Sequence, residues 1–325
     1  MAAKKTPLIT VLGSLNIDLV SYVPHHPLPG ETLTSNSFAV SPGGKGANQA
    51  VACAKLSRSR SAPRSDETAH IRMVGAVGAD TYGGLLTSNL AAHGVDTSGV
   101  SSAAELKTGV AVIVVDEPTG QNRIILSPEA NHSLRASQFS PALPGPAPDL
   151  LVMQLEVPLD VVLAALASAR AASVPVLLNP APAQPLPASA YDGLAHLVVN
   201  ETEAAILAGV PESTLDDEAG LERVGRIFLG RGVRNVIVTL GGRGVFYMAA
   251  EGVEGEKKGL VPAEKAKVVD TTAAGDTFVG QYALEVVSHP GAFDIEAAVK
   301  KANRAAAKTV EKLGAQDSIP WRDEL

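Results

Sequence analysis

The chain has little of several residue types, and each shortage excludes a class of protein. Cys53 is the only cysteine among 325 residues, so no disulfide can form within the chain. A reducing compartment suits such a sequence, and we expect the cytoplasm, with the nucleus as the alternative. No apolar run approaches the roughly 20 residues that a membrane-spanning helix needs, so no membrane partner is predicted.

Aromatic residues and basic charge are also scarce. Aromatic residues make up 4% of the chain, and 27 Lys and Arg face 34 Asp and Glu, for a formal net charge of −7. Proteins that bind nucleic acids concentrate Lys and Arg on one face. The sequence therefore predicts no nucleic-acid partner.

The two ends of the chain have short segments that resemble targeting signals. Lys4 and Lys5 precede an apolar stretch at 8–12 that is too short for the core of a signal peptide. The last four residues, 322–325, resemble a retention tail of the endoplasmic reticulum, but such a tail is read only on a protein that enters that compartment. We interpret the apolar stretch as a first strand instead.

Short apolar runs alternate with Ala-rich stretches along most of the chain. Such runs are typical of strands that are buried on both faces of a parallel sheet, and they cover residues 8–12, 71–77, 150–154, 174–178, 194–199 and 235–240. Helical stretches separate most of them, at 47–56, 83–93, 159–171, 201–208, 218–231 and 277–287. The alternation predicts βαβ units and an α/β fold with a parallel sheet.

Two regions break this alternation and are rich in residues typical of strands. Segments 18–22 and 31–40 flank a Pro-rich turn, and segments 108–115 and 121–126 flank a strong hairpin turn at 116–120. These pieces predict a small sheet outside the main layer that serves as a lid. The polar segment 57–68 is rich in Ser and Arg, and we interpret it as a mobile loop.

The segment 269–278 combines small residues with a carboxylate at the start of a predicted helix. The free N–H groups at the start of that helix could hold a phosphate. Phosphoryl transfer also needs a carboxylate that receives the proton of the acceptor hydroxyl, and Asp276 stands where it could do so. The alternative is that Asp276 only caps the helix.

A second glycine-rich segment runs from Gly43 to Ala50 and also leads into a helix. It is not a Walker A loop, because Lys45 is followed by Gly46 rather than by Ser or Thr. Its glycines would let the backbone approach a compact ligand, to which Lys45 and Asn48 offer hydrogen bonds. The alternative is a glycine-rich turn with an exposed lysine.

Other polar residues follow predicted strands, where ligands bind to open α/β sheets. Several hydrogen-bonding groups at one edge would suit a sugar, although each residue alone could be a turn or a cap. The polar residues that follow predicted strands are Asn16, Asp18, Glu156, Asn200 and Glu203. The Gly-rich turn at 239–244 also follows a strand, and it could instead be an ordinary hairpin turn.

Together these segments resemble the ribokinase-like family of sugar kinases, from residue 11 to about residue 321. Residues 43–50 resemble the first signature of the family and Asp270–Phe278 the second. Three further segments follow the order of the family: Asn179-Pro180-Ala181-Pro182, Asn200-Glu201-Thr202-Glu203 and Gly314-Ala315-Gln316.

The resemblance implies one α/β domain over residues 1–325, with a doubly wound, mostly parallel sheet flanked by helices. It also implies a small β-sheet lid, formed by about residues 16–44 and 106–127, through which two copies form a homodimer. The implied reaction transfers the terminal phosphoryl group of ATP, with Mg²⁺ and K⁺, to the 5-hydroxyl of D-ribose, and yields ribose 5-phosphate.

The resemblance also implies roles for individual residues. Asp276 would be the general base, beside an anion hole of Ala273, Ala274 and Gly275. The sugar would contact Asn16, Asp18, Gly44, Lys45, Asn48, Glu156 and Asp276. The nucleotide would contact Asn200, Thr239, Gly241, Gly242, Arg243, Gly244, Gly275 and Asn303, and Glu203 would position Mg²⁺ through water. Potassium would be held by Asp270, Thr272, Thr309, the carbonyl of Lys312, Gly314 and Ser318. Instead of contacting the nucleotide, Asn303 could belong to the solvated face of a helix.

The sequence departs from the family pattern at Ser127-Pro128-Glu129-Ala130-Asn131, where a run of small residues, Ala-Gly-Ala-Asn, is usual. Segment 57–68 resembles an insertion. Two other functions stay open: a kinase for deoxyribose, fructose or a nucleoside, and a non-catalytic sugar-binding protein. The second would be expected to have lost its base or anion hole, whereas Asp276 and Gly275 are present.

Overall fold

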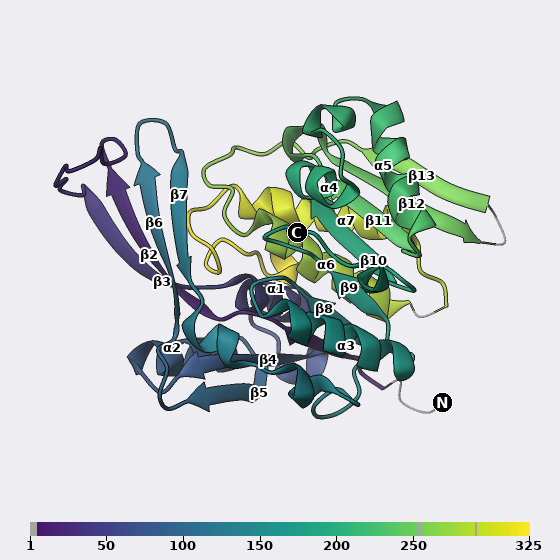
Figure 1. Cartoon of the computed structure of the whole chain (residues 1–325), viewed down its shortest axis with the longest axis horizontal. Helices are drawn as coiled ribbons and strands as arrows, with labels where there is room; N and C mark the ends of the chain where they lie inside the picture. The colour runs from purple at the N-terminus through teal and green to yellow at the C-terminus, as the bar shows by residue number, and fades with distance from the viewer. Residues whose placement is uncertain (1–4, 253–254, 290) are drawn as a thin grey trace.

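The computed structural model describes residues 5–252, 255–289 and 291–325, and within these ranges its main body is a nine-stranded sheet (Figure 1). The strands are β1 (Leu8–Leu12), β4 (His70–Gly78), β5 (Asp96–Ala103), β8 (Leu150–Met153), β9 (Val176–Leu178), β10 (His196–Asn200), β11 (Asn235–Thr239), β12 (Val245–Gly252) and β13 (Gly255–Val261). Their order is β13-β12-β11-β10-β9-β8-β1-β4-β5, and in the described part of the chain all pairs are parallel except β11 with β12 and β12 with β13.

The strands at the centre of this sheet are buried on both faces, which explains their continuous apolar sequences. In β1, Ile9 and Val11 pack into the cluster on one face, while Leu12 packs into the cluster on the other. Ile9 is in register with Ile71 of β4 and Leu150 of β8. Strand β1 therefore runs through the middle of the hydrophobic core.

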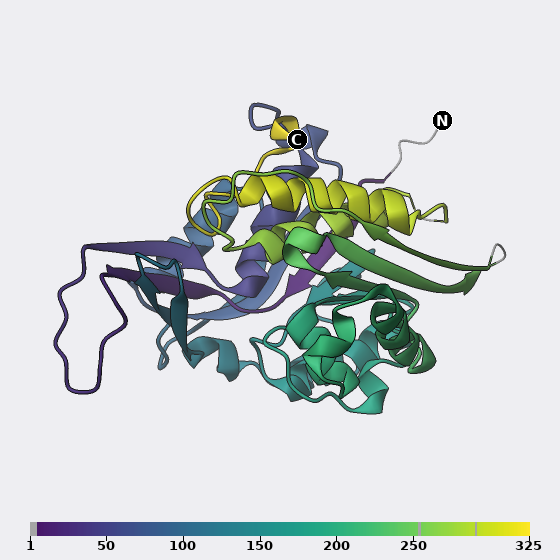
Figure 2. The ribbon, with the colours of Figure 1, turned by 90° about the horizontal axis from the view of Figure 1, so that it is seen from above.

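Helices cover both faces of the sheet, as a doubly wound fold requires. The apolar cluster on one face draws its helical residues from α1 (Lys45–Ser57), α2 (Thr81–Ala92), α6 (Ala274–Ser288) and α7 (Ile295–Thr309). The cluster on the other face contains α3 (Leu159–Ala171), α4 (Glu201–Ala208) and α5 (Glu218–Gly230). Figure 2 shows the yellow and yellow-green α6 and α7 on the opposite side of the sheet from the green α4 and α5.

A second, four-stranded sheet stands beside the main body (Figure 1). It consists of β2 (Asn16–Val23), β3 (Ser37–Gly43), β6 (Gly109–Asp116) and β7 (Asn122–Ser127), in the order β3-β2-β6-β7. At its root Asn16 is in register with Gly43 of β3 and with Gly109 of β6. The small sheet thus begins where the first strand of the main sheet ends.

The predicted fold class is confirmed, since a mostly parallel sheet carries helices on both faces and a small sheet beside it. The six predicted strands and six predicted helices all form, with ends that differ by at most three residues. The prediction missed β5, β12, β13 and the bounds of α7. It was wrong to begin the second strand of the small sheet at residue 31, because β3 begins at Ser37.

The segment predicted as a mobile loop, 57–68, is bonded to the C-terminal segment. The N–H of Arg60 donates to Asp323, and the guanidinium of Arg322 donates to the carbonyl of Ser57. A short 3₁₀ turn, Arg64–Asp66, lies within it. Across the described ranges, none of the helices has the length and apolar character needed to cross a bilayer.

Candidate active site

The N-terminus of α6 lies at the centre of the site. The helix begins at Ala274, directly after Ala273, which adopts a left-handed conformation with φ of 60°. The first N–H groups of a helix have no partner within the helix, and they favour an anion. The N–H of Ala274 donates to the carbonyl of Thr271 at 3.3 Å, and a Cβ added to Gly275 would meet no atom within 4 Å, so there is open space around Gly275.

Asp276 is buried in the first turn of α6, and its carboxylate is bonded to α1. Its Oδ2 accepts a 3.0 Å hydrogen bond from the amide of Asn48, and its Oδ1 accepts one of 2.9 Å from Gln49. The cap position of α6 is Ala273, with no side-chain cap. Asp276 is therefore not a helix cap, and its carboxylate is fixed by a neighbouring helix.

Two glycines let the start of α1 approach the root of the small sheet. Gly44 precedes α1 with φ of 87°, and a Cβ added there would lie 2.7 Å from the backbone nitrogen of Asn16. A Cβ added to Gly43 would lie 2.1 Å from Oδ2 of Asp18. The glycine-rich segment thus brings Lys45 and Asn48 next to Asn16 and Asp18.

Glu156, which follows β8, bonds to two of the other segments that the sequence had singled out, those of Asn16 and Lys45. Its Oε2 accepts hydrogen bonds from the hydroxyl of Ser14 at 2.5 Å, the N–H of Lys45 at 3.1 Å and the amide of Asn16 at 3.5 Å. Of the polar residues predicted after separate strands, Asn16, Asp18 and Glu156 therefore meet at one place.

The carboxylates in this cluster perturb one another. Burial, together with the charges of Glu156 and Asp276, raises the pKa of Asp18 to about 7. Burial lowers the pKa of Lys45, but Asp276, Glu156 and Glu203 outweigh this, and the pKa ends above its ordinary value. A cluster of buried groups with perturbed pKa values in one place is typical of a functional site.

The segment that departs from the family pattern also reaches the site. Asn131 donates to Oδ1 of Asn16 at 2.7 Å and accepts from the N–H of Leu15 at 2.9 Å. Two residues earlier, Glu129 has φ of 46°, a conformation that favours glycine. The carboxylate thus stands at a position whose backbone suits the glycine of the usual pattern, while Asn131 fixes the orientation of Asn16.

A separate pocket of about 520 Å³ opens on the other side of Ala274 and Gly275. It lies between the end of β11, the segment after β13 and α7, and its size is that of a small-molecule site. Asn303 is buried in its wall and donates to the carbonyl of Pro262 at 2.8 Å, so it does not belong to a solvated helix face. Of the residues predicted to contact a nucleotide, the pocket is lined by Thr239, Gly241, Gly242, Gly244, Gly275 and Asn303.

Two other predicted nucleotide contacts, Arg243 and Asn200, and Glu203, which was predicted to position Mg²⁺, have different partners. The guanidinium of Arg243 bonds to the carboxylate of Glu201 and to the carbonyls of Leu215 and Asp216. Asn200 and Glu203 form a reciprocal cap at the start of α4, with two hydrogen bonds of 2.8 Å. These residues do not line the pocket in this structure.

Comparison with known proteins identifies the family. Residues 6–322 match the model of the pfkB family carbohydrate kinases. The chain belongs to this family. It is 42% identical over 321 residues to a ribokinase of Schizosaccharomyces pombe, with 96% of this chain and 94% of that protein covered.

Solved structures agree with this assignment. A ribokinase of Thermotoga maritima has a TM-score of 0.81 at 37% identity, covering 98% of this chain and 97% of its own. A ribokinase of Arabidopsis thaliana, in complex with ribose and ATP, has a TM-score of 0.81 at 28% identity and the same coverage. The chain is therefore a carbohydrate kinase, with the fold of this family.

The residues predicted to hold potassium in this carbohydrate kinase are only partly in contact. Asp270 accepts from the N–H and hydroxyl of Thr272 and from the N–H of Gly314. The hydroxyls of Thr309 and Ser318 bond to Thr277 and to the carbonyl of Ala315, and the ammonium of Lys312 bonds to Glu324. Within the described ranges, no three His, Cys, Asp or Glu residues are arranged to hold a metal ion, so carbonyl oxygens would have to complete such a site.

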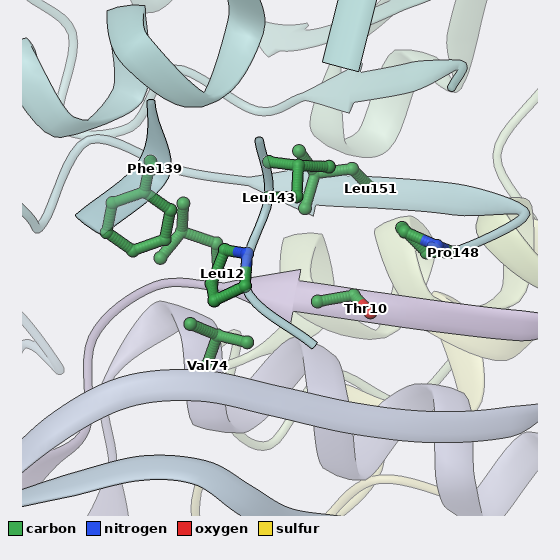
Figure 3. Close-up of a pocket in the computed structure, with 8 residues that line it drawn as sticks. Thr10, Leu12, Val74, Phe139, Leu143, Pro148 and Leu151 are labelled. Carbon is green, nitrogen blue, oxygen red and sulfur yellow. The ribbon is translucent and has the colours of Figure 1, made fainter. Parts of the chain in front are cut away.

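A further pocket, shown in Figure 3, lies away from these groups, between one face of β1, β4 and β8 and the segment that carries Phe139, Leu143 and Pro148. Its volume of about 10 Å³ is close to the minimum that holds one water. Its lining is apolar apart from Thr10, whose hydroxyl has no hydrogen-bond partner in the described part of the protein. The kinase does not have room for a substrate there.

Several residues of the kinase site were not assigned a role from the sequence. Gln49, Asn131, Asn179 and Gln316 stood in segments that the sequence analysis quoted, but nothing in those segments indicated which side chain each would contact. Ser14 and Gln154 had no signal beyond their place at the ends of strands. Only the packing of α1 on the sheet brings them together.

Proposed function

We propose that this carbohydrate kinase transfers the terminal phosphoryl group of ATP to the 5-hydroxyl of D-ribose. The observation that carries the proposal is the position of the α6 N-terminus between two sites. Asp276 faces the polar cluster of Asn16, Asp18, Lys45, Asn48 and Glu156. Its neighbours Ala274 and Gly275 line the 520 Å³ pocket on the other side.

In this proposal the sugar occupies the polar cluster and the nucleotide occupies the pocket. Asp276 receives the proton of the 5-hydroxyl as that oxygen attacks the γ-phosphorus, and the bond from phosphorus to the β-phosphate oxygen breaks. The N–H groups at Ala273, Ala274 and Gly275 stabilise the charge on the migrating phosphoryl group. Lys45 adds a positive charge among the carboxylates.

Metal ions complete the proposal. Mg²⁺ would neutralise charge on the phosphates, and Glu203 would position the ion through water. The carboxylate of Glu203 lies close enough to Lys45 to raise the pKa of Lys45. Potassium would be held by Asp270 and by the carbonyls of the segments that Asp270 joins through Gly314. The cytoplasm is the compartment we propose.

The small sheet would act as the lid over the sugar and as the contact to a second copy. Its root carries Asn16 and Asp18, so its movement would open or close the polar cluster. Val40, Val112 and Ile125 stand in one row across its strands, on the same face, and are 46%, 38% and 66% exposed, an apolar surface that is typical of a protein interface. We propose a homodimer through this surface.

The acceptor is tested by a kinetic panel with ATP, Mg²⁺ and K⁺, using ribose, 2-deoxyribose, fructose and adenosine. We expect the highest kcat/KM with ribose and a product whose phosphorus couples to the protons on C5. A higher kcat/KM with another acceptor would contradict ribose as the substrate. Binding of ribose without phosphorylation of any acceptor would favour a non-catalytic sugar-binding protein.

A further inference from the structure

Both oxygens of the Asp276 carboxylate are held by amides of α1. Asn48 donates to Oδ2 at 3.0 Å, and Gln49 donates to Oδ1 at 2.9 Å. Gln49 is fully buried, whereas Asp276 is 7% exposed and stands at the edge of the polar cluster. One of the two side chains that hold the carboxylate is thus out of reach of solvent.

Every hydrogen-bonding position of the Gln49 amide that faces the network is occupied. Its nitrogen donates to Asp276 and, at 3.0 Å, to Oδ1 of Asn179. Its oxygen accepts a 2.5 Å hydrogen bond from the amide of Gln154. Since an amide nitrogen has only two hydrogens, Gln49 has no donor left for a substrate, and Asp276 is its direct link to the proposed reaction.

The charge of Asp276 dictates the orientation of each amide around it. A carboxylate only accepts hydrogen bonds, so Gln49 must turn its nitrogen toward Asp276 and its oxygen toward Gln154. For the same reason Asn48 turns its oxygen away, where it accepts a 3.0 Å hydrogen bond from Gln316. The oxygen of Gln316 then accepts from Asn89 at 2.6 Å.

This network of amides is anchored to rigid parts of the fold. Asn179 donates to the carbonyl of Val198 in β10. On the other side, the buried ammonium of Lys55 donates to the backbone carbonyl of Gln316 at 3.0 Å. Asn179 and Gln316, to which the sequence analysis assigned no role, thus each supply one amide to this network from the segments 179–182 and 314–316.

We propose that Gln49 and Gln316 are positioning residues for Asp276, Gln49 directly and Gln316 through Asn48. The proposal rests on the proposed function, in which Asp276 is the general base. Without these amides, the carboxylate can rotate away from the line between its oxygen and the sugar hydroxyl. A displacement of about 1 Å in such a group can reduce the rate by about 10²-fold, while substrate contacts made by other residues persist.

The test compares Gln49→Met, which keeps the length of the side chain but cannot donate, with the matched control Gln281→Met. Gln281 is also nearly buried, lies on α6 and bonds to Glu285 rather than to Asp276. Steady-state kinetics with ribose and ATP, together with unfolding in urea, are measured for both. We expect a roughly 10- to 100-fold lower kcat for Gln49→Met with both KM values within about threefold of wild type, and an unchanged kcat for the control.

A double-mutant cycle with Asp276→Ala separates positioning from a general weakening of the fold. If Gln49 acts only through Asp276, Gln49→Met will cause no further loss of single-turnover rate in the Asp276→Ala background. Losses that multiply would overturn the proposal. So would a Gln49→Met kcat within twofold of wild type.

Two further outcomes keep the proposals distinguishable. If Asp276→Ala itself keeps its turnover, Asp276 is not the base and the proposed function fails at that point, whatever Gln49 does. If Gln49→Met does not fold, Gln316→Met decides. Gln316→Met should lower kcat at least tenfold in the wild-type background and have no effect on the rate in the Asp276→Ala background. A similar fold loss in both backgrounds would overturn the proposal.

Discussion

The backbone N–H of Gly314 donates a 2.9 Å hydrogen bond to Oδ2 of Asp270, across 44 positions of the chain. This contact joins the segment that leads into α6 to the segment that follows α7. Because Ala273 to Gly275 come directly after Asp270 and Thr272, an ion held at this junction would fix the backbone of the proposed anion hole.

We therefore predict that potassium raises turnover without contacting either substrate. Salt-stripped enzyme assayed in potassium, sodium and tetramethylammonium chloride at matched ionic strength should have the highest kcat in potassium. Because loss of one donor to a developing anion costs about 10²–10³-fold, a loosened hole should lower kcat by roughly tenfold or more. Potassium should also raise the Tm of wild type but not of Asp270→Ala. Equal kcat in all three salts would contradict this prediction.

The raised pKa of Asp18 predicts how stability depends on pH. Because its pKa is about 7 in the folded protein against an ordinary 3.8, the folded state binds more protons than the unfolded state between these values. Wild type should therefore lose stability as pH rises from about 4 to about 7, relative to Asp18→Asn. At roughly 1.4 kcal/mol per pH unit, the gap should grow by at most about 4 kcal/mol.

Urea unfolding of both proteins at pH 5, 6, 7 and 8 measures this gap. A difference in unfolding free energy that is the same at all four values would mean that Asp18 does not carry an extra proton in the folded state.

Asn16 should affect the sugar far more than the nucleotide. Its side chain is held by Asn131 and Glu156 within the polar cluster, away from the 520 Å³ pocket. Asn16→Ala leaves polar groups of the sugar and of Asn131 unpaired, at about 1–3 kcal/mol. We expect the KM for ribose to rise about 5- to 100-fold and that for ATP to change little. Asn122→Ala, at an exposed position of β7, is the control, and equal rises in both constants for Asn16→Ala would assign Asn16 to the fold.

Thr10 offers a test of the packing of the core. Its buried hydroxyl has no partner among the described residues and borders the small pocket of Figure 3. Thr10→Val should raise the free energy of unfolding by about 1 kcal/mol, because it removes an unpaired polar group at nearly constant volume. Thr108→Val loses the hydrogen bonds to Asp80 and to the N–H of Gly78, so its free energy of unfolding should fall by about 1–3 kcal/mol. A loss of stability in Thr10→Val would mean that a water in the pocket pairs with the hydroxyl.

The sequence predicted the core strands because residues such as Ile9 and Val11 are buried in an unbroken apolar run. It failed at β5 and β13, whose positions at the sheet edges permit polar residues such as Asp96 and Lys258. The bounds of helix α7 were missed because its buried positions, Ala298, Ala302 and Ala305 among them, alternate with exposed residues such as Lys300 and Arg304. Local composition indicates burial on both faces of a sheet well, and burial on one face poorly.

For the site, the sequence predicted residue types at strand ends but not their contacts. The neighbours of Asp276 come from α1, since Asn48 and Gln49 are more than 220 positions away. No local pattern reports a distance of that kind. The resemblance to a family supplied roles for single residues, and the structure adds the amides that hold them, together with the partners that keep Arg243 out of the pocket wall.

The central claim is that Asp276 takes the proton from the sugar hydroxyl during phosphoryl transfer, and Asp276→Asn tests it most directly. The measurement is kcat with ribose and ATP for wild type and Asp276→Asn, and the affinities for ribose and ATP are measured by calorimetry on the same samples. We predict a kcat that is lower by roughly 10²–10⁴-fold, with both affinities within about threefold of wild type. A kcat within a factor of two of wild type would contradict the account.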